Sequence, residues 1–126
     1  IVYVFKHQPS SSRILTPQEI GSVSRDYVDS PIGKCYSVFD KAVMNQNIED
    51  AEEIKRNRYC YSKPDESSHI CTLAAPVWNF ENRVVGVLVA SDLATDETKR
   101  EPLGREFVQI AERISRKLGY LGDFNE

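Results

Sequence analysis

Residues 72–92 of the chain, TLAAPVWNFENRVVGVLVASD, decide the fold. An apolar run ends in the turn-like segment 79–83, and a longer run of Val, Leu and Ala follows it. Two β-prone runs separated by a short polar segment predict an antiparallel hairpin. We therefore expect this hairpin at the centre of a sheet.

The second run of the hairpin has two different faces. Strand geometry places Val85, Val87 and Val89 on one face and Gly86 and Ala90 on the other. The branched face is expected to pack against a helix. The small residues of the other face allow a close neighbour, and the terminal helix is a better candidate for it than a ligand.

The remaining elements follow from local signals. Pro31 with Ser30 before it predicts a helix start and its N-cap. An acidic beginning and a basic end predict a short helix within 48–57. Apolar residues at three-and-four spacing predict a last helix that begins around Leu103 and stops near Gly119. Strands are expected at 1–5, 13–16 and 42–45. The predicted fold class is α+β, a central antiparallel β-sheet flanked by α-helices.

Length and charge limit the possible functions. A chain of 126 residues is the size of one domain with its own core. Its formal net charge of −3 gives no electrostatic case for direct contact with nucleic acid. No apolar run is long enough to cross a bilayer, so we expect no membrane partner and a cytoplasmic location.

The chain has an odd number of cysteines, so they cannot all be paired in disulfides within it. They are Cys35, Cys60 and Cys71, and none forms a Cys-x-x-Cys pair. Only His69 and Cys71 bring two possible metal ligands close together, whereas a zinc site usually needs four. We therefore expect reduced, mostly buried thiols and no metal.

The pattern of the whole chain resembles that of a GAF domain. This resemblance implies a GAF/PAS-like fold. The residues that carry the likeness are IVYVF at 1–5, SPIGK at 30–34, the segment 43–50, LAAPV at 73–77, VGVLV at 85–89 and the helix 107–118. The resemblance covers residues 1–126 as a single sensor domain, without the helix that usually precedes the first strand. A narrower likeness to the effector-binding domain of IclR-type transcription regulators rests on AAPV at 74–77 and ISRKLGY at 114–120.

The resemblance implies a regulatory domain that senses an unknown small-molecule effector within a larger signalling or transcription-regulating protein. It implies no cofactor and no enzyme activity. A homodimer is expected, and the apolar edge of Val108, Tyr120 and Leu121 is interpreted either as core or as a contact with another chain. The candidate ligand-binding residues are Tyr36, Phe39, Asp50, Tyr61, Thr72 and Ser91.

Two alternatives remain open. One is a dimerisation module that binds no ligand, with a pocket filled by Phe39 and Tyr61. The other resembles the free methionine-R-sulfoxide reductases, GAF-fold enzymes with a cysteine nucleophile. Cys35 would be that nucleophile, but Thr72 and Ser91 stand where that family has carboxylates. Such chemistry needs an acid to protonate the sulfoxide.

Overall fold

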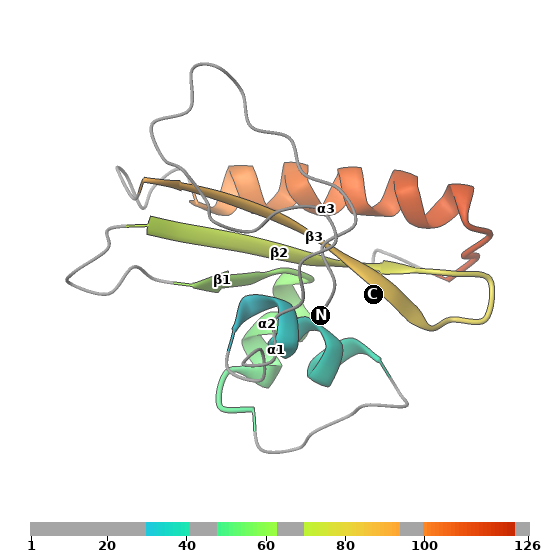
Figure 1. Ribbon diagram of the computed structural model, residues 1–126, viewed down its shortest axis with the longest axis horizontal. Coiled ribbons are helices and arrows are strands. Elements are labelled where there is room, and N and C mark those ends of the chain that lie inside the picture. The colour runs from blue at the N-terminus through green and yellow to red at the C-terminus, as the bar shows by residue number, and fades with distance from the viewer. Residues whose placement is uncertain (1–29, 41–47, 63–69, 94–99, 123–126) are drawn as a thin grey trace, which may run out of the picture.

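A computed structural model describes residues 30–40, 48–62, 70–93 and 100–122 (Figure 1). The strands expected at 1–5, 13–16 and 42–45 lie outside these ranges. The described elements are α1 (Pro31–Phe39), α2 (Ala51–Asn57), β1 (Cys60–Ser62), β2 (Ile70–Trp78), β3 (Val84–Leu93) and α3 (Arg100–Lys117).

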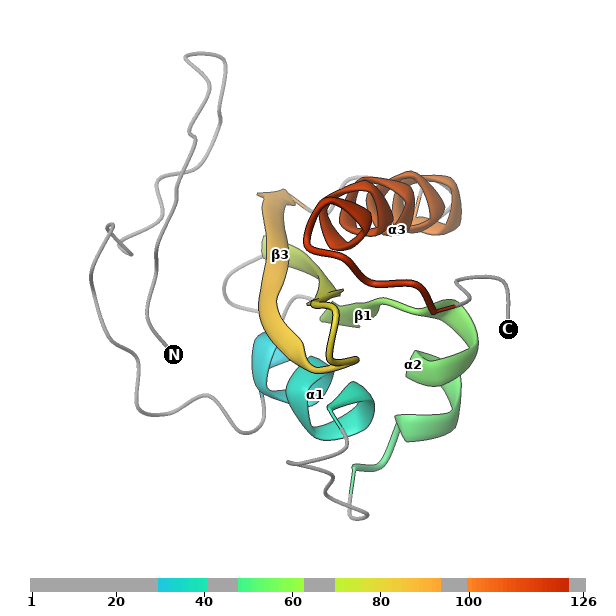
Figure 2. The ribbon, with the colours of Figure 1, turned by 90° about the vertical axis from the view of Figure 1, so that its right-hand side faces the viewer.

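The described strands form an antiparallel sheet in the order β1-β2-β3. Figure 2 shows α3 on one face of this sheet and α1 and α2 on the other. The predicted α+β class is confirmed, because helices flank an antiparallel sheet.

The hairpin of β2 and β3 forms as expected. Thr72 pairs with Ser91 and Ala75 with Leu88. In the turn, the Asn79 side-chain oxygen accepts hydrogen bonds from the backbone N–H groups of Glu81 and Arg83, at 2.9 and 3.1 Å. An Asn side chain that bonds to the backbone two residues ahead is a common turn-forming device.

The starts of the first two helices also follow the sequence signals. The Ser30 hydroxyl accepts a hydrogen bond from the Gly33 N–H at 3.2 Å, so Ser30 is the N-cap of α1. The helix α2 begins at Ala51 with acidic residues in its first turn. It stops before Arg58, whose left-handed φ of 66° ends the helix.

The last helix begins earlier than the sequence predicts. We expected a start around Leu103, but α3 begins at Arg100 and includes Pro102 in its first turn. The first N–H groups of a helix have no partner within it, so a proline costs little there. At the other end, Gly119 has a φ of 85°, and the Tyr120 N–H donates to the Ser115 carbonyl at 3.0 Å. This left-handed cap confirms the predicted stop.

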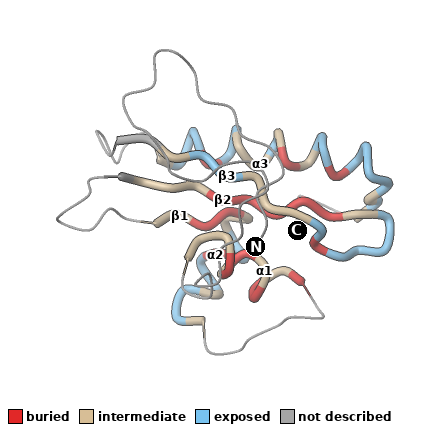
Figure 3. Tube along the Cα trace, in the orientation of Figure 1, coloured by how far each residue is buried: buried red, intermediate tan, exposed pale blue. Residues whose placement is uncertain are grey.

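The core has a cluster on each face of the sheet. Figure 3 shows buried residues along β2, α1 and α3. Towards α1 and α2 lie Cys35, Val38, Ile54, Cys60 and Ala74. Towards α3 lie Tyr59, Ala75, Val77 and Ala111. The strand β2 contributes to both clusters, and it is therefore the central element of the described sheet.

A bulge in β2 is tied to α3 by a buried serine. The register shifts between Val77 and Trp78. The Trp78 N–H donates to the Ser115 hydroxyl at 3.0 Å, and this hydroxyl donates to the Ala111 carbonyl at 2.8 Å. A buried N–H without a partner costs free energy, so Ser115 satisfies a group that the bulge would otherwise leave unpaired.

A second tie joins α1 to the hairpin turn. Asp40 is only 2% exposed, and its carboxylate accepts two hydrogen bonds from the Arg83 guanidinium, at 2.8 and 3.2 Å. These bonds raise the pKa of Arg83 above its ordinary value. The two hydrogen bonds from Arg83 offset the free-energy cost of removing the charged Asp40 carboxylate from water.

The two faces of β3 differ from the prediction. Val87 packs against the α1 cluster as expected, but Val85 and Val89 are exposed. A Cβ placed on Gly86 would meet no described atom within 4 Å, so none of the described elements approaches it closely. The close approach occurs instead at Gly104 of α3, which lies against the Tyr59 ring.

Candidate functional site

A cavity of about 490 Å³ opens at the edge of the sheet beside β1. Its wall is made by the start of α1, by α2, by β1 and by the first residue of α3. Residues that could recognise a ligand in this wall are Lys34, Asp50, Glu53, Tyr61, Ser62 and Arg100. Four separate segments thus meet around one cavity.

The charges around the cavity are balanced. Lys34 Nζ lies 3.5 Å from Asp50 Oδ2, and Arg100 Nη2 lies 3.8 Å from Glu53 Oε1. The Arg100 guanidinium also lies over the Tyr61 ring, 4.9 Å from its centroid. Both ion pairs are partly exposed and long, so each contributes little to stability. Their groups can therefore exchange partners with a bound molecule at low cost.

A row of hydroxyl groups extends from the cavity across the sheet. Ser62 lines the cavity and pairs with Thr72, which pairs in turn with Ser91. Directly paired residues share a face of the sheet. The Thr72 and Ser91 hydroxyls lie 3.1 Å apart and share a hydrogen bond. A row of hydroxyl-bearing residues therefore crosses the three described strands, beginning at the cavity.

The six candidate residues from the sequence fall into separate places. Asp50 and Tyr61 line the cavity, and Thr72 and Ser91 belong to the hydroxyl row. The remaining two, Tyr36 and Phe39, pack beside Trp78 and Val84 in another part of the core.

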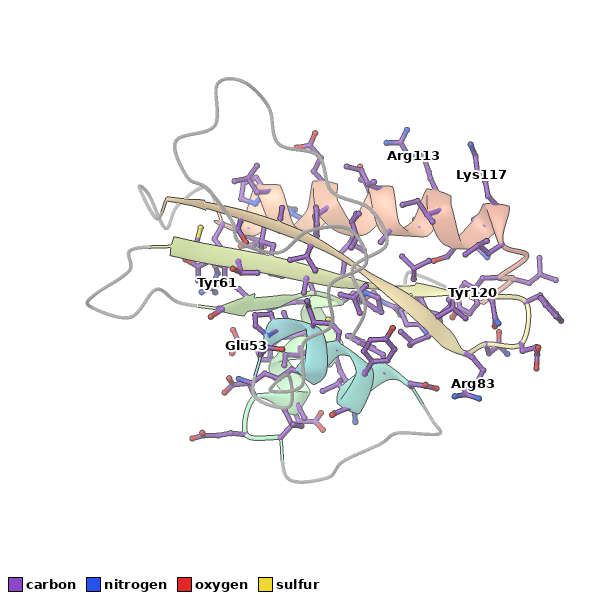
Figure 4. The ribbon with its side chains drawn as sticks, viewed as in Figure 1. Glu53, Tyr61, Arg83, Arg113, Lys117 and Tyr120 are labelled. Carbon is purple, nitrogen blue, oxygen red and sulfur yellow. The ribbon has the colours of Figure 1, made fainter. Side chains whose placement is uncertain are left out.

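Four residues that could recognise a ligand in the cavity were not among the candidates: Lys34, Glu53, Ser62 and Arg100. Figure 4 shows Glu53 and Tyr61 at the same end of the molecule. In the sequence, Glu53 is explained by its place near the start of a helix, where acidic residues are favourable. It offered no local signal for Arg100, because contact with this side of the sheet depends on how α3 packs.

Two of the thiols lie deep in the core. Cys35 is 0% exposed, and its Sγ donates to the Ala74 carbonyl at 3.3 Å. Burial raises the pKa of the Cys35 thiol, and burial raises the pKa of Cys60 to about 11. Only the thiolate is a good nucleophile, and both environments disfavour it. Cys71 is half-buried.

We expect one thiol of the native chain to react quickly with the disulfide reagent DTNB at pH 7.5. That thiol is Cys71, since Cys35 and Cys60 are buried and protonated. A Cys71→Ser variant should lose the fast phase, and denaturant should release the other two thiols. Fast labelling of Cys35 would contradict this assignment and reopen the cysteine-enzyme alternative.

Within the described ranges, no three His, Cys, Asp or Glu side chains gather as metal ligands. His69 lies outside these ranges, so its predicted proximity to Cys71 is not described. Among the same residues, no helix combines the length and apolarity needed to cross a bilayer.

The sequence is similar to that of a bacterial transcription regulator. No protein-family model matches the chain. It is 25% identical to the uncharacterized HTH-type transcriptional regulator RhmR of Escherichia coli K12, over 98% of this chain and 55% of that protein. The chain thus spans about half the length of this curated relative.

Several solved structures share the fold, among them a repressor and a regulator of the IclR family. Pseudomonas aeruginosa HmgR superposes with a TM-score of 0.69 at 18% identity, covering 92% of this chain and 54% of that one. The Agobacterium tumefaciens repressor BlcR superposes with a TM-score of 0.68 at 15% identity, covering 82% of this chain and 51% of that one. A regulator described as a member of the IclR family superposes with a TM-score of 0.68 at 13% identity. The match covers 89% of this chain and 76% of that one.

At these identities the structural likeness establishes the fold alone. It supports the narrower, IclR-type resemblance at the level of fold, while the wider GAF resemblance stays a prediction. RhmR and the IclR-family structure are transcriptional regulators by name, and BlcR is a repressor by name, so these names point to a regulatory domain.

Proposed function

We propose that this chain is the effector-sensing domain of a transcription regulator of the IclR type. The observation that carries the proposal is the similarity to an HTH-type regulator over 98% of the chain. A further regulator structure with the same fold, from Vibrio cholerae, is described as a C-terminal domain (TM-score 0.65, 15% identity). DNA binding would then belong to another part of the protein.

The cavity beside β1 is the proposed effector site. Asp50 and Tyr61 stand in its wall, and Thr72 and Ser91 continue its polar surface through Ser62. Because two cations and two carboxylates line it, the site suits a small polar molecule with both donor and acceptor groups. Tyr36 and Phe39 would act only indirectly, through the packing of α1.

The route from site to output runs through α3. Arg100 is the first residue of this helix, and it lies on the Tyr61 ring and near the Glu53 carboxylate. A ligand that competes for Glu53 or Arg100 changes the contacts that hold the start of α3. Such a ligand shifts the protein only by its difference in affinity for the two arrangements.

The two alternatives have weaker support. A module for dimerisation alone requires a filled pocket, whereas an open cavity of about 490 Å³ remains beside Tyr61. A cysteine-dependent reductase requires a reactive thiolate, whereas Cys35 is fully buried with a raised pKa. We therefore favour a sensing domain without enzyme activity.

A thermal-shift screen with small polar metabolites tests the proposal, using amino acids, sugars and short organic acids at millimolar concentration. A compound that binds the folded state raises the melting temperature. Ser62→Trp, which fills the cavity, should abolish the shift. Phe80→Trp, in the exposed turn, is the matched control and should preserve it. A shift that survives Ser62→Trp would place the ligand elsewhere, and a screen without any shift would contradict sensing.

A further inference from the structure

One side of α3 carries apolar residues that the described core does not use. Leu103 is 51% exposed and Ile114 is 36% exposed, and Ile110 lies between them. Ile110 and Ile114 line a groove of about 230 Å³ together with Arg113 and Lys117. We call this surface the outer face of α3; its residues are Leu103, Glu106, Ile110, Arg113, Ile114 and Lys117.

The spacing of these residues gives one continuous row along the helix. Leu103, Ile110 and Lys117 are seven residues apart, so they lie almost above one another on a helix. Ile114 lies one turn beyond Ile110 on the same side. The row therefore presents apolar side chains over about three turns, a length suited to pairing with another helix.

The charges beside this row differ between its two halves. Glu106 lies towards the start of α3, and Arg113 and Lys117 lie towards its end. All three side chains belong to exposed residues. None of the three takes part in an ion pair among the described residues. Glu112 and Arg116, by contrast, pair with each other on another side of the helix. Figure 4 shows Arg113 and Lys117 projecting from α3 away from the sheet.

We propose that the outer face of α3 binds the same face of a second copy of this chain, with the two helices antiparallel. A two-fold axis near Ile110 places Glu106 of each copy opposite Arg113 of the other, and Leu103 opposite the aliphatic stem of Lys117. Parallel pairing would instead put each charge opposite its own kind. The charge pattern thus selects both the partner and its direction.

The size of this face sets the strength of the dimer. Stable interfaces bury about 800 Å² on each partner, and a single helix face provides less. We therefore expect a reversible dimer with a dissociation constant on the order of micromolar. The edge predicted from the sequence does not serve this role, because Val108 packs in the core and Tyr120 stacks on Trp78. Leu121, its third member, is 90% exposed.

Sedimentation velocity of the 126-residue chain at rising concentration tests the proposal. We expect a monomer–dimer equilibrium that Glu106→Arg weakens at least tenfold, since it faces Arg113 of the partner with a like charge. Arg113→Glu with Lys117→Glu should weaken it similarly. Combining all three substitutions should restore the dimer, because the exchanged charges again face opposite charges.

The control is Arg105→Glu, an exposed charge reversal on another side of α3, which should leave the equilibrium unchanged. Circular dichroism checks that each variant is folded. A wild-type chain that stays monomeric at 0.5 mM (about five hundredfold above a micromolar dissociation constant) would overturn the proposal. A dimer insensitive to Glu106→Arg, or one that the triple variant fails to restore, would overturn it as well. These outcomes do not depend on the small-molecule cavity.

Discussion

Replacing Trp78 by Ala should lower the free energy of unfolding by about 3–5 kcal/mol, the usual cost of deleting a large buried aromatic side chain. The indole is only 7% exposed. Its ring meets the Phe39 ring edge to face at 5.6 Å and stacks on the Tyr120 ring at 5.2 Å. Truncation removes both aromatic contacts and leaves a cavity among three elements.

Urea unfolding followed by far-UV circular dichroism measures this loss, because the variant has no tryptophan to follow by fluorescence. Phe80→Ala is the matched control: this aromatic residue lies in the nearby turn and is 70% exposed. It should change the free energy of unfolding by less than about 0.5 kcal/mol. If both variants lose the same stability, the stacked arrangement around Trp78 is not a main source of stability.

Trp78 also connects elements that matter for signalling. Phe39 is the last residue of α1, and Tyr120 lies just beyond the end of α3. The Trp78 N–H is bound by Ser115 of the same helix. One residue of β2 therefore holds the ends of two helices on opposite faces of the sheet, so a change at one helix can reach the other through it.

Local sequence signals predicted the described elements except β1, where no strand was expected. The turn at 79–83, the Ser30 cap and the stop at Gly119 each depend on a few neighbouring residues. The same signals misplaced the start of α3, because a proline in the first turn resembles a helix boundary.

The cavity could be predicted only in part. Asp50 and Tyr61 were identified as polar or aromatic residues of a pocket, but Arg100 comes from a helix that begins far along the chain. Its contact with Tyr61 depends on the angle at which α3 crosses the sheet. Tyr36 and Phe39 share the helical stripe of α1, and only tertiary packing separates their surroundings from the cavity.

The glycines show the same division between local and tertiary information. A glycine in a strand suggests a close neighbour, and Gly86 has none. A glycine within a helix suggests only lower helix propensity, yet Gly104 is buried against the Tyr59 ring. Sequence alone cannot distinguish the two positions, because the neighbour at Gly104 comes from the segment before β1.

Gly104→Ala should therefore destabilise the protein by about 1–3 kcal/mol, as overpacking of a filled site does. Helix propensity alone would predict the opposite, a gain of about 1 kcal/mol. The added methyl group overlaps the Tyr59 ring, which is 4% exposed and has little room to move.

Gly86→Ala is the matched control, because its new methyl group meets nothing within 4 Å. We expect its free energy of unfolding to stay within about 0.5 kcal/mol of wild type. A Tyr59→Ala background supplies the decisive comparison, since removing the ring should remove most of the cost of Gly104→Ala. If the cost persists there, the strain arises within α3 and not from the contact with Tyr59. Urea unfolding of the four proteins in this cycle distinguishes the two origins, because only a contact between the residues makes their effects non-additive.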